Sequence, residues 1–194
     1  MSVSTNDPVI VGISGATGAV YGIEALRMLR ELGITSHLVI TENGARTIDI
    51  ETDLSLDDVR ALADHHYSNK DMASAIASGS FKTQGMLIAP CSIKTLSGVA
   101  NSFSANLMVR AADVMLKERR PLVLMVRETP LHSGHLRLMS QAASAGARIM
   151  PPVPAFYTKP KSIMDIVRHS VGRALDQLNI DHELCDRWDG DLSE

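Results

Sequence analysis

The segment Pro8-Val-Ile-Val-Gly-Ile-Ser-Gly-Ala-Thr-Gly18 sets the architecture of this chain. Its first half, 8–13, is continuously apolar and rich in β-branched residues, which is typical of a strand buried on both faces of a parallel sheet. Its second half, 14–18, is small and turn-forming. Apolar residues then recur at helical spacing from Val20 to Leu32 and stop at Gly33. The pattern predicts a strand, a tight loop and a helix in direct succession.

Strand-like and helix-like segments alternate along the rest of the chain. We predict strands at 36–41, 85–90, 120–126 and 147–150, and helices at 45–52, from Ser55, around 107–115, at 134–145 and at 162–178. This alternation predicts a doubly wound α/β fold, Rossmann-like or flavodoxin-like, whose mostly parallel sheet carries helices on both faces. No repeat or linker interrupts it, so we expect one domain over 1–194, with an extended C-terminal tail after about residue 180.

Composition excludes several classes of protein. Of the 194 residues, 45% are hydrophobic and 21% charged, which is close to globular averages and argues against disorder or a fibrous state. The net charge of −3 offers no field to attract nucleic acid or an acidic membrane. Cys91 and Cys185 lie far apart and suit a reducing compartment, and Met1–Pro8 lacks the pattern of a signal or membrane helix. We therefore expect a cytoplasmic protein.

Two loops at predicted strand ends favour phosphate. The first, Gly12-x-x-Gly15-x-x-Gly18, departs from the dinucleotide fingerprint G-x-G-x-x-G and so disfavours NAD. Its glycines and the hydroxyls of Ser14 and Thr17 still suit a phosphate at a helix N-terminus. The second, Pro90-Cys-Ser-Ile-Lys-Thr95, again opens a helix with small hydroxyl residues. For the first loop, a tight βα turn without a ligand remains the alternative, and two such loops are more specific for phosphate than one.

Two pairs of charged residues are further candidates for the site. Arg127-Glu128 follows directly on an apolar strand, which places a guanidinium and an acid at the edge of the sheet where ligands bind. Arg110 and Lys117 lie two turns apart on one helix face, where they form either a basic wall or an ordinary solvated face.

Other residues leave their alternatives open. Tyr157 and Arg173 suit a second anionic group if they converge, because phosphate accepts charge-assisted hydrogen bonds well. Glu51 is either a functional carboxylate or an ordinary exposed one. Cys91 reads better as a small buried residue than as a nucleophile, and His132-x-x-His135 has no third ligand, so we expect no metal site.

Taken in order, eight segments resemble the UbiX/Pad family of flavin prenyltransferases, and most closely its UbiX members of ubiquinone biosynthesis. They are Gly12-Ile-Ser-Gly-Ala-Thr-Gly18, Glu51-Thr-Asp53, Ser78-Gly-Ser80, Pro90-Cys-Ser-Ile-Lys-Thr95, Arg110-Ala-Ala-Asp-Val114, Lys117-Glu-Arg-Arg-Pro-Leu-Val123, Val126-Arg-Glu-Thr-Pro-Leu131 and Pro152-Val-Pro-Ala-Phe-Tyr157. The resemblance runs nearly end to end, and such an ordered series is far more specific than one glycine loop.

The resemblance implies an activity. Members of this family, formerly called 3-octaprenyl-4-hydroxybenzoate carboxy-lyases, transfer a dimethylallyl group from dimethylallyl phosphate to N5 of reduced FMN and close a ring through C6. The product, prenyl-FMN, is the cofactor of a UbiD-type decarboxylase. Family members are homo-oligomers, commonly dodecamers, with sites between subunits. Whether the donor here is the monophosphate or the diphosphate stays open.

The resemblance also implies roles for individual residues. The expected FMN contacts are Ser14, Gly15, Ala16, Thr41, Ser92, Ile93, Lys94, Thr95 and Arg127. The expected contacts of the prenyl phosphate are Ser78, Gly79, Arg110, Lys117, Tyr157 and Arg173, and the expected catalytic residues are Glu128, Glu51 and Lys117, with no metal. Two positions depart from the family: Thr17 stands where Ser is more frequent, and Met72 where some members carry an aromatic residue.

Two rival functions share part of this pattern. An FMN-dependent cysteine decarboxylase of the related homo-oligomeric family would share the fold, but its Pro-Ala-Ser-Ala-Asn-Thr segment is missing. A non-catalytic flavin-binding subunit would need no second phosphate site, so the Arg110, Lys117, Glu128, Tyr157 and Arg173 set argues against it.

Overall fold

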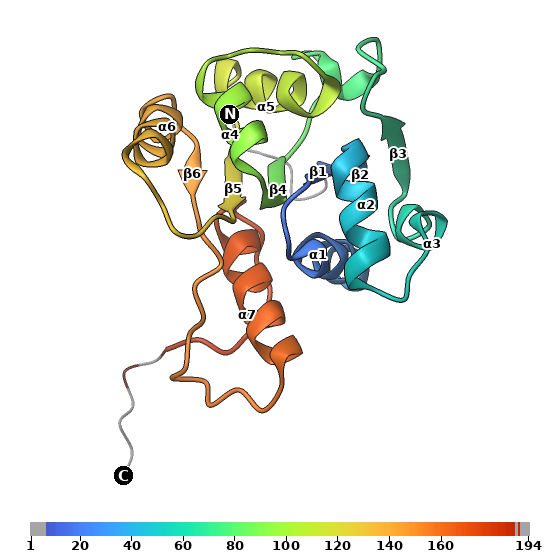
Figure 1. Cartoon of the computed structure of the whole chain (residues 1–194). Coiled ribbons are helices and arrows are strands. Elements are labelled where there is room, and N and C mark those ends of the chain that lie inside the picture. Colours follow the sequence, from blue (N-terminus) through green and yellow to red (C-terminus); the bar gives the residue numbers. More distant parts are fainter. Residues whose placement is uncertain (1–6, 189, 191–194) are drawn as a thin grey trace.

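Six strands form one parallel sheet in the order β3-β2-β1-β4-β5-β6 (Figure 1). The strands are β1 (Val9–Ile13), β2 (Ser36–Ile40), β3 (His65–Ser68), β4 (Gly85–Cys91), β5 (Leu122–Val126) and β6 (Arg148–Ile149). The helices are α1 (Ala19–Glu31), α2 (Glu42–Glu51), α3 (Leu56–Arg60), the 3-10 helix η1 (Ala75–Ala77), α4 (Ile93–Ala100), α5 (Leu107–Lys117), α6 (Ser133–Ser144) and α7 (Ile163–Asp176).

This computed structural model describes residues 7–188 and 190. The expectation about the N-terminal segment therefore lies almost wholly outside the described residues, as does the end of the expected C-terminal tail. Within the part of the chain that is described, no helix is long and apolar enough to cross a membrane.

The predicted doubly wound fold is confirmed. The strand order reverses between β1 and β4, and in sheets of this type ligands bind beyond the carboxyl ends of the strands at that point. The two loops for which the sequence predicts phosphate binding, 12–18 after β1 and 90–95 after β4, both leave the sheet there. The topology thus brings together segments that are about eighty residues apart in the chain.

The structure differs from the prediction at β3, α2 and β6. The β3 strand was not predicted, because His65-His-Tyr-Ser68 is a short polar edge strand without an apolar run. The α2 helix begins at Glu42 rather than at 45, since the Thr41 hydroxyl accepts a hydrogen bond from the Gly44 N–H at 3.0 Å and so caps the helix before Asn43-Gly44. Strand β6 keeps only two of its predicted residues.

Side chains of β1 alternate between two cores. Val9, Val11 and Ile13 belong to the core beneath α1 and α7, while Ile10 belongs to the core beneath α4 and α5. Figure 1 shows these helix pairs on opposite sides of the strands. A Cβ on Gly22 of α1 would lie 2.3 Å from the Ala89 carbonyl oxygen, so α1 sits directly on the sheet next to the switch point.

Residues 181–188 have no helix or strand, but they pack back onto α7. The His182 side chain is fully buried, with Nε2 2.9 Å from the Gly172 carbonyl oxygen. Arg187 binds both carboxylate oxygens of Asp176, at 2.9 and 3.1 Å. The described part of the expected tail is therefore anchored on its neighbouring helix.

Candidate active site

Ser14 joins the two predicted phosphate-binding loops, after β1 and after β4. Its hydroxyl donates to the Pro90 carbonyl at 2.8 Å and accepts from the Ser92 N–H at 2.8 Å. The residue is completely buried. Because the hydroxyl is occupied by these contacts, we expect any ligand contact of Ser14 to come from its backbone.

The second loop leads into the N-terminus of α4. Ser92 caps this helix, and its hydroxyl accepts from the Thr95 N–H at 3.3 Å. Lys94 is exposed in the first turn, beside backbone N–H groups that have no partner within a helix. The helix dipole and the lysine charge both favour an anion at this position.

A cleft of about 910 Å³ lies over these groups. Of the nine predicted FMN contacts, it is lined by Gly15, Thr41, Ser92, Ile93, Lys94 and Thr95. Ser14 lies buried beneath it, and Ala16 is in the neighbouring loop without lining it. A Cβ on Gly15 would lie 2.3 Å from the Cβ of Asn43, so only glycine lets the β1 loop approach the start of α2 here.

Asn69 and Asn106 also line this cleft and were not predicted. Asn106 caps α5, with its side-chain oxygen accepting from the Val109 N–H at 3.1 Å. Asn69 accepts from the Met108 N–H at 3.0 Å. An Asn immediately before the apolar Leu107 is a readable capping signal, whereas Asn69 follows the strand that the sequence did not predict.

Arg127 and Glu128 line a smaller pocket of about 350 Å³ on the other side of the β1 loop, together with Thr17. Glu128 also lines the large cleft, so this residue borders both spaces. Glu128 Oε1 accepts from the Thr129 N–H at 3.0 Å. The structure therefore brings the acid at the end of β5 to the cleft, as its sequence position predicts.

Glu51 has a contact that its sequence position did not indicate. Its Oε2 accepts hydrogen bonds from the N–H groups of Gly18 at 2.8 Å and Ala19 at 3.0 Å. These are among the first N–H groups of α1, which has no side-chain cap of its own. Glu51 thus closes the N-terminus of α1 from the end of α2, next to Thr17.

The predicted phosphate contacts Ser78, Gly79, Arg110 and Lys117 gather around one loop. Arg110 Nε donates to the Ala77 carbonyl at 3.1 Å, and the Lys117 ammonium is ion-paired with Glu118 and lies against Gly79. This loop packs on α5. From Asn106 at the cleft to Lys117, α5 rises about 16 Å. The cluster around Lys117 is therefore remote from the cleft of its own chain.

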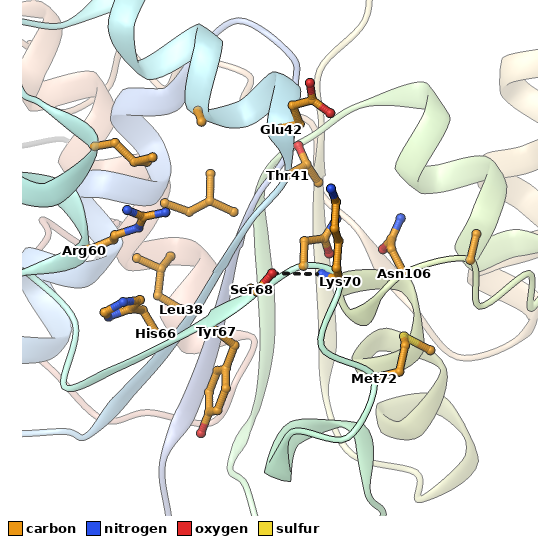
Figure 2. A pocket seen from close by; sticks show the side chains of 15 residues that line it. Leu38, Thr41, Glu42, Arg60, His66, Tyr67, Ser68, Lys70, Met72 and Asn106 are labelled. Carbon is orange, nitrogen blue, oxygen red and sulfur yellow. Dashed lines mark hydrogen bonds between the residues drawn. The ribbon is translucent and has the colours of Figure 1, made fainter.

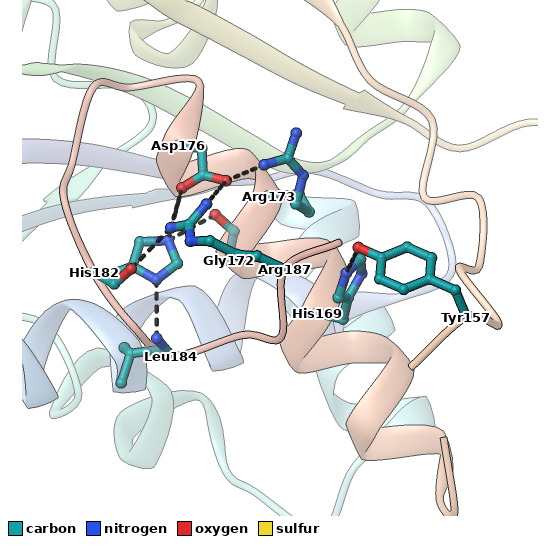
Figure 3. A network of polar contacts seen from close by, with 8 residues as sticks. All are labelled: Tyr157, His169, Gly172, Arg173, Asp176, His182, Leu184 and Arg187. Carbon is teal, nitrogen blue, oxygen red and sulfur yellow. Dashed lines mark hydrogen bonds and ion pairs between the residues drawn. The ribbon is translucent and has the colours of Figure 1, made fainter. Parts of the chain in front are cut away.

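Tyr157 and Arg173 form a third group, at α7. The Tyr157 hydroxyl lies 2.9 Å from His169 Nε2, and Arg173 pairs with Asp176 (Figure 3). Neither residue lines the large cleft or the pocket beside Glu128. A single chain thus gathers six of the nine predicted flavin contacts around one cleft and leaves the predicted phosphate contacts in two separate groups.

Another hollow, of about 690 Å³, continues from the large cleft along the ends of β2 and β3 (Figure 2). The two spaces share Thr41, Glu42, Asn69, Ala105 and Asn106. Met72 projects into this hollow with Lys70 nearby. The family departure at Met72 therefore falls beside the flavin cleft, in a space that the sequence did not predict.

Cys91 and His132, candidates from the sequence for catalysis or metal binding, have structural roles in the fold. Burial raises the pKa of the Cys91 thiol to about 12, so the thiol stays protonated at neutral pH. His132 caps α6, with Nδ1 accepting from the Gly134 N–H at 3.0 Å and its ring against that of His135. In residues 7–188 and 190 no group of three or more His, Cys, Asp or Glu could hold a metal ion.

Comparison with known proteins agrees with this geometry. Residues 2–175 match the Flavoprotein family. The flavin prenyltransferase UbiX of Thauera aromatica is 56% identical over 182 residues, which cover 94% of each chain. This chain belongs to the UbiX family of flavin prenyltransferases. The resemblance drawn from its sequence motifs is confirmed.

Solved structures of UbiX-family proteins share the whole fold. The crystal structure of AnUbiX (PadA1) in complex with FMN and dimethylallyl pyrophosphate matches with a TM-score of 0.93 and 49% identity, over 95% of this chain and 98% of that chain. A dodecameric FMN-dependent UbiX-like decarboxylase from Escherichia coli O157:H7 matches with a TM-score of 0.91 and 46% identity, over 94% and 100% of the two chains.

The rival family is more distant. The FMN-dependent cysteine decarboxylase SpaF matches with a TM-score of 0.62 at 15% identity, over 76% of this chain and 85% of that chain. At that identity the match shows a shared fold alone. The cysteine decarboxylase function is therefore less supported than flavin prenyl transfer.

The Ser14→Ala variant tests the connection between the loops. It removes both hydrogen bonds and leaves the Ser92 N–H without its partner, so we expect a loss of about 1–3 kcal/mol in the free energy of unfolding and weaker FMN binding. Chemical denaturation and fluorescence titration with FMN measure the two effects. Ser140→Ala, an exposed serine on α6, is the control and should change neither; wild-type values for Ser14→Ala would contradict the assignment.

The Glu51→Ala variant tests the cap on α1. Loss of a carboxylate at a helix N-terminus should lower the free energy of unfolding by about 0.3–1 kcal/mol at low salt, and Glu51→Gln should recover part of that loss through its amide oxygen. Thermal denaturation of both variants gives the comparison. Asp49→Ala, an exposed acid on the same helix, serves as control, and an equal loss in that variant would count against a specific role of Glu51.

Proposed function

We propose that this chain transfers a dimethylallyl group from dimethylallyl phosphate to reduced FMN, at N5 and C6, and releases prenyl-FMN. The cleft supports this proposal best, because six of the nine predicted FMN contacts line it around a helix N-terminus suited to the FMN phosphate. Family membership supports the same reaction. The related AnUbiX was crystallised with FMN and dimethylallyl pyrophosphate, so the diphosphate is the second donor to test.

The residues of the cleft suit this chemistry. Reduced FMN supplies the nucleophilic N5, which loses its proton as the allyl group replaces it and phosphate leaves. Closing a ring through C6 then moves one proton off C6 and one onto the alkene. Glu128 lies where the cleft meets the smaller pocket, so we assign the proton transfers to its carboxyl group. Arg127 next to it would hold the flavin, and Thr17 on the β1 loop faces the same pocket.

The remaining phosphate contacts would come from neighbouring copies. Lys117 lies about 16 Å along α5 from the cleft, and Tyr157 and Arg173 line neither flavin-side pocket. Their cations would stabilise the departing phosphate if a second subunit brought them to the flavin of the first. A homo-oligomer, as in the dodecameric relative from E. coli, therefore forms part of the proposal.

The wider context follows from the product. We propose that prenyl-FMN passes to a UbiD-type decarboxylase, as in ubiquinone biosynthesis, and that the protein works in the cytoplasm. Cys91 and Cys185 are both free thiols, which is consistent with a reducing compartment.

Mass spectrometry tests the reaction directly. The purified protein is incubated anaerobically with reduced FMN and dimethylallyl phosphate, and the mass of the released flavin is measured. A flavin heavier by one C5H8 unit is expected. Unmodified FMN with either the monophosphate or the diphosphate would reject prenyl transfer and leave the flavin-binding function.

The Glu128→Gln variant tests the proton-transfer role. The amide keeps the size of the side chain but cannot take up a proton, so we expect FMN affinity to stay within about twofold while prenyl transfer slows on the order of 100-fold. Single-turnover formation of prenyl-FMN measures the rate. Asp57→Asn removes a carboxylate on α3, away from the cleft, and should react normally; a normal rate for Glu128→Gln would remove Glu128 from the mechanism.

A further inference from the structure

Tyr157 is held from two sides although it lies in an irregular segment. Its hydroxyl is 2.9 Å from His169 Nε2, and the two rings meet edge to face with centroids 5.5 Å apart. Trp188 of the anchored C-terminal segment packs edge to face on the same tyrosine ring at 5.6 Å. The phenol is therefore oriented by α7 and by the segment that packs back onto it.

Arg173 lies on the same side of the molecule. His169 and Arg173 are four residues apart on α7 and so share one helix face. Figure 3 shows the Tyr157 hydroxyl and the Arg173 guanidinium on one side of the helix, with Asp176 beyond the arginine. Asp176 also binds Arg187. Burial opposes ionisation of Asp176, but the hydrogen bond and charge of Arg187 outweigh it and hold its pKa below the usual value.

The chemistry of the ligand decides the direction of the Tyr157–His169 hydrogen bond. A phosphate has only acceptor oxygens, so Tyr157 can bind it well only by donating its single O–H proton. If that proton pointed at His169 Nε2, the phosphate would meet oxygen lone pairs. With a proton on Nε2, the imidazole donates to the phenol oxygen and leaves the Tyr157 O–H free to point outward.

We propose that His169 is a positioning residue for Tyr157. It donates from Nε2–H to the phenol oxygen and thereby directs the hydroxyl toward the phosphate of the allyl donor, beside Arg173. This inference rests on the proposed function, because it takes the ligand of Tyr157 to be the donor phosphate.

Calorimetric titration of the FMN-loaded, oxidised protein with dimethylallyl phosphate tests this role, because it measures donor binding without turnover. His169→Leu should weaken donor binding about tenfold, the range of one charge-assisted hydrogen bond. His169→Gln, whose amide N–H can still donate, should stay within about threefold of the wild type. FMN affinity and melting temperature should not change, and His65→Leu, an exposed histidine on β3 that lines none of the pockets described above, is the control.

A double-mutant cycle separates positioning from a general effect on α7. If His169 acts through Tyr157, Tyr157→Phe combined with His169→Leu should bind the donor no more weakly than Tyr157→Phe alone. Wild-type affinity in His169→Leu, or losses that add in the double variant, would overturn the proposal.

Failure of the proposed function gives a different result. A wild-type protein that binds the donor but makes no heavier flavin would refute prenyl transfer. The double-mutant cycle on donor binding would still test the positioning role of His169. A wild-type protein that binds neither the monophosphate nor the diphosphate would refute both.

Discussion

The buried hydroxyl of Ser14 connects the two halves of the candidate site. It bridges the Pro90 carbonyl and the Ser92 N–H, and so joins the loop after β1 to the loop after β4 at the point where the strand order reverses. A buried hydroxyl must satisfy its hydrogen bonds inside the protein, which fixes the spacing of the loops within a few tenths of an ångström. The N-terminus of α4 and the glycines of the first loop can then face one cleft.

The same fold explains why one chain holds an incomplete set of groups. Parallel strands deliver the ends of β1, β2, β4 and β5 to one edge of the sheet, and the predicted flavin contacts come from those ends. The helices run back toward the opposite edge, and α5 carries Lys117 away from the cleft. Cations that lie so far from the flavin can reach one only across a subunit boundary, which makes assembly a requirement of the proposed chemistry.

The C-terminal part of the chain carries two of the residues for which we propose contacts with the donor phosphate. Tyr157 lies in an irregular segment, yet His169 and Trp188 hold its ring. Arg173 is tied through Asp176 to Arg187, beyond the end of α7. Preorganised donors lose less entropy when they bind an anion. In the proposed site, the short C-terminal segment would act by holding Tyr157 through Trp188 and Asp176 through Arg187.

Local pattern in the sequence was enough for the strands with apolar runs, the helices with caps and the two loops that favour phosphate, because burial period and capping chemistry act over a few residues. Six of the residues that the family motifs predict as flavin contacts also line one cleft. The edge strand β3 and Asn69 beside it were not predicted, since this strand is short and polar and has no apolar run. The bridge made by Ser14, the cap supplied by Glu51 and the remoteness of Lys117 depended on tertiary structure, because each reflects how elements far apart in sequence pack together.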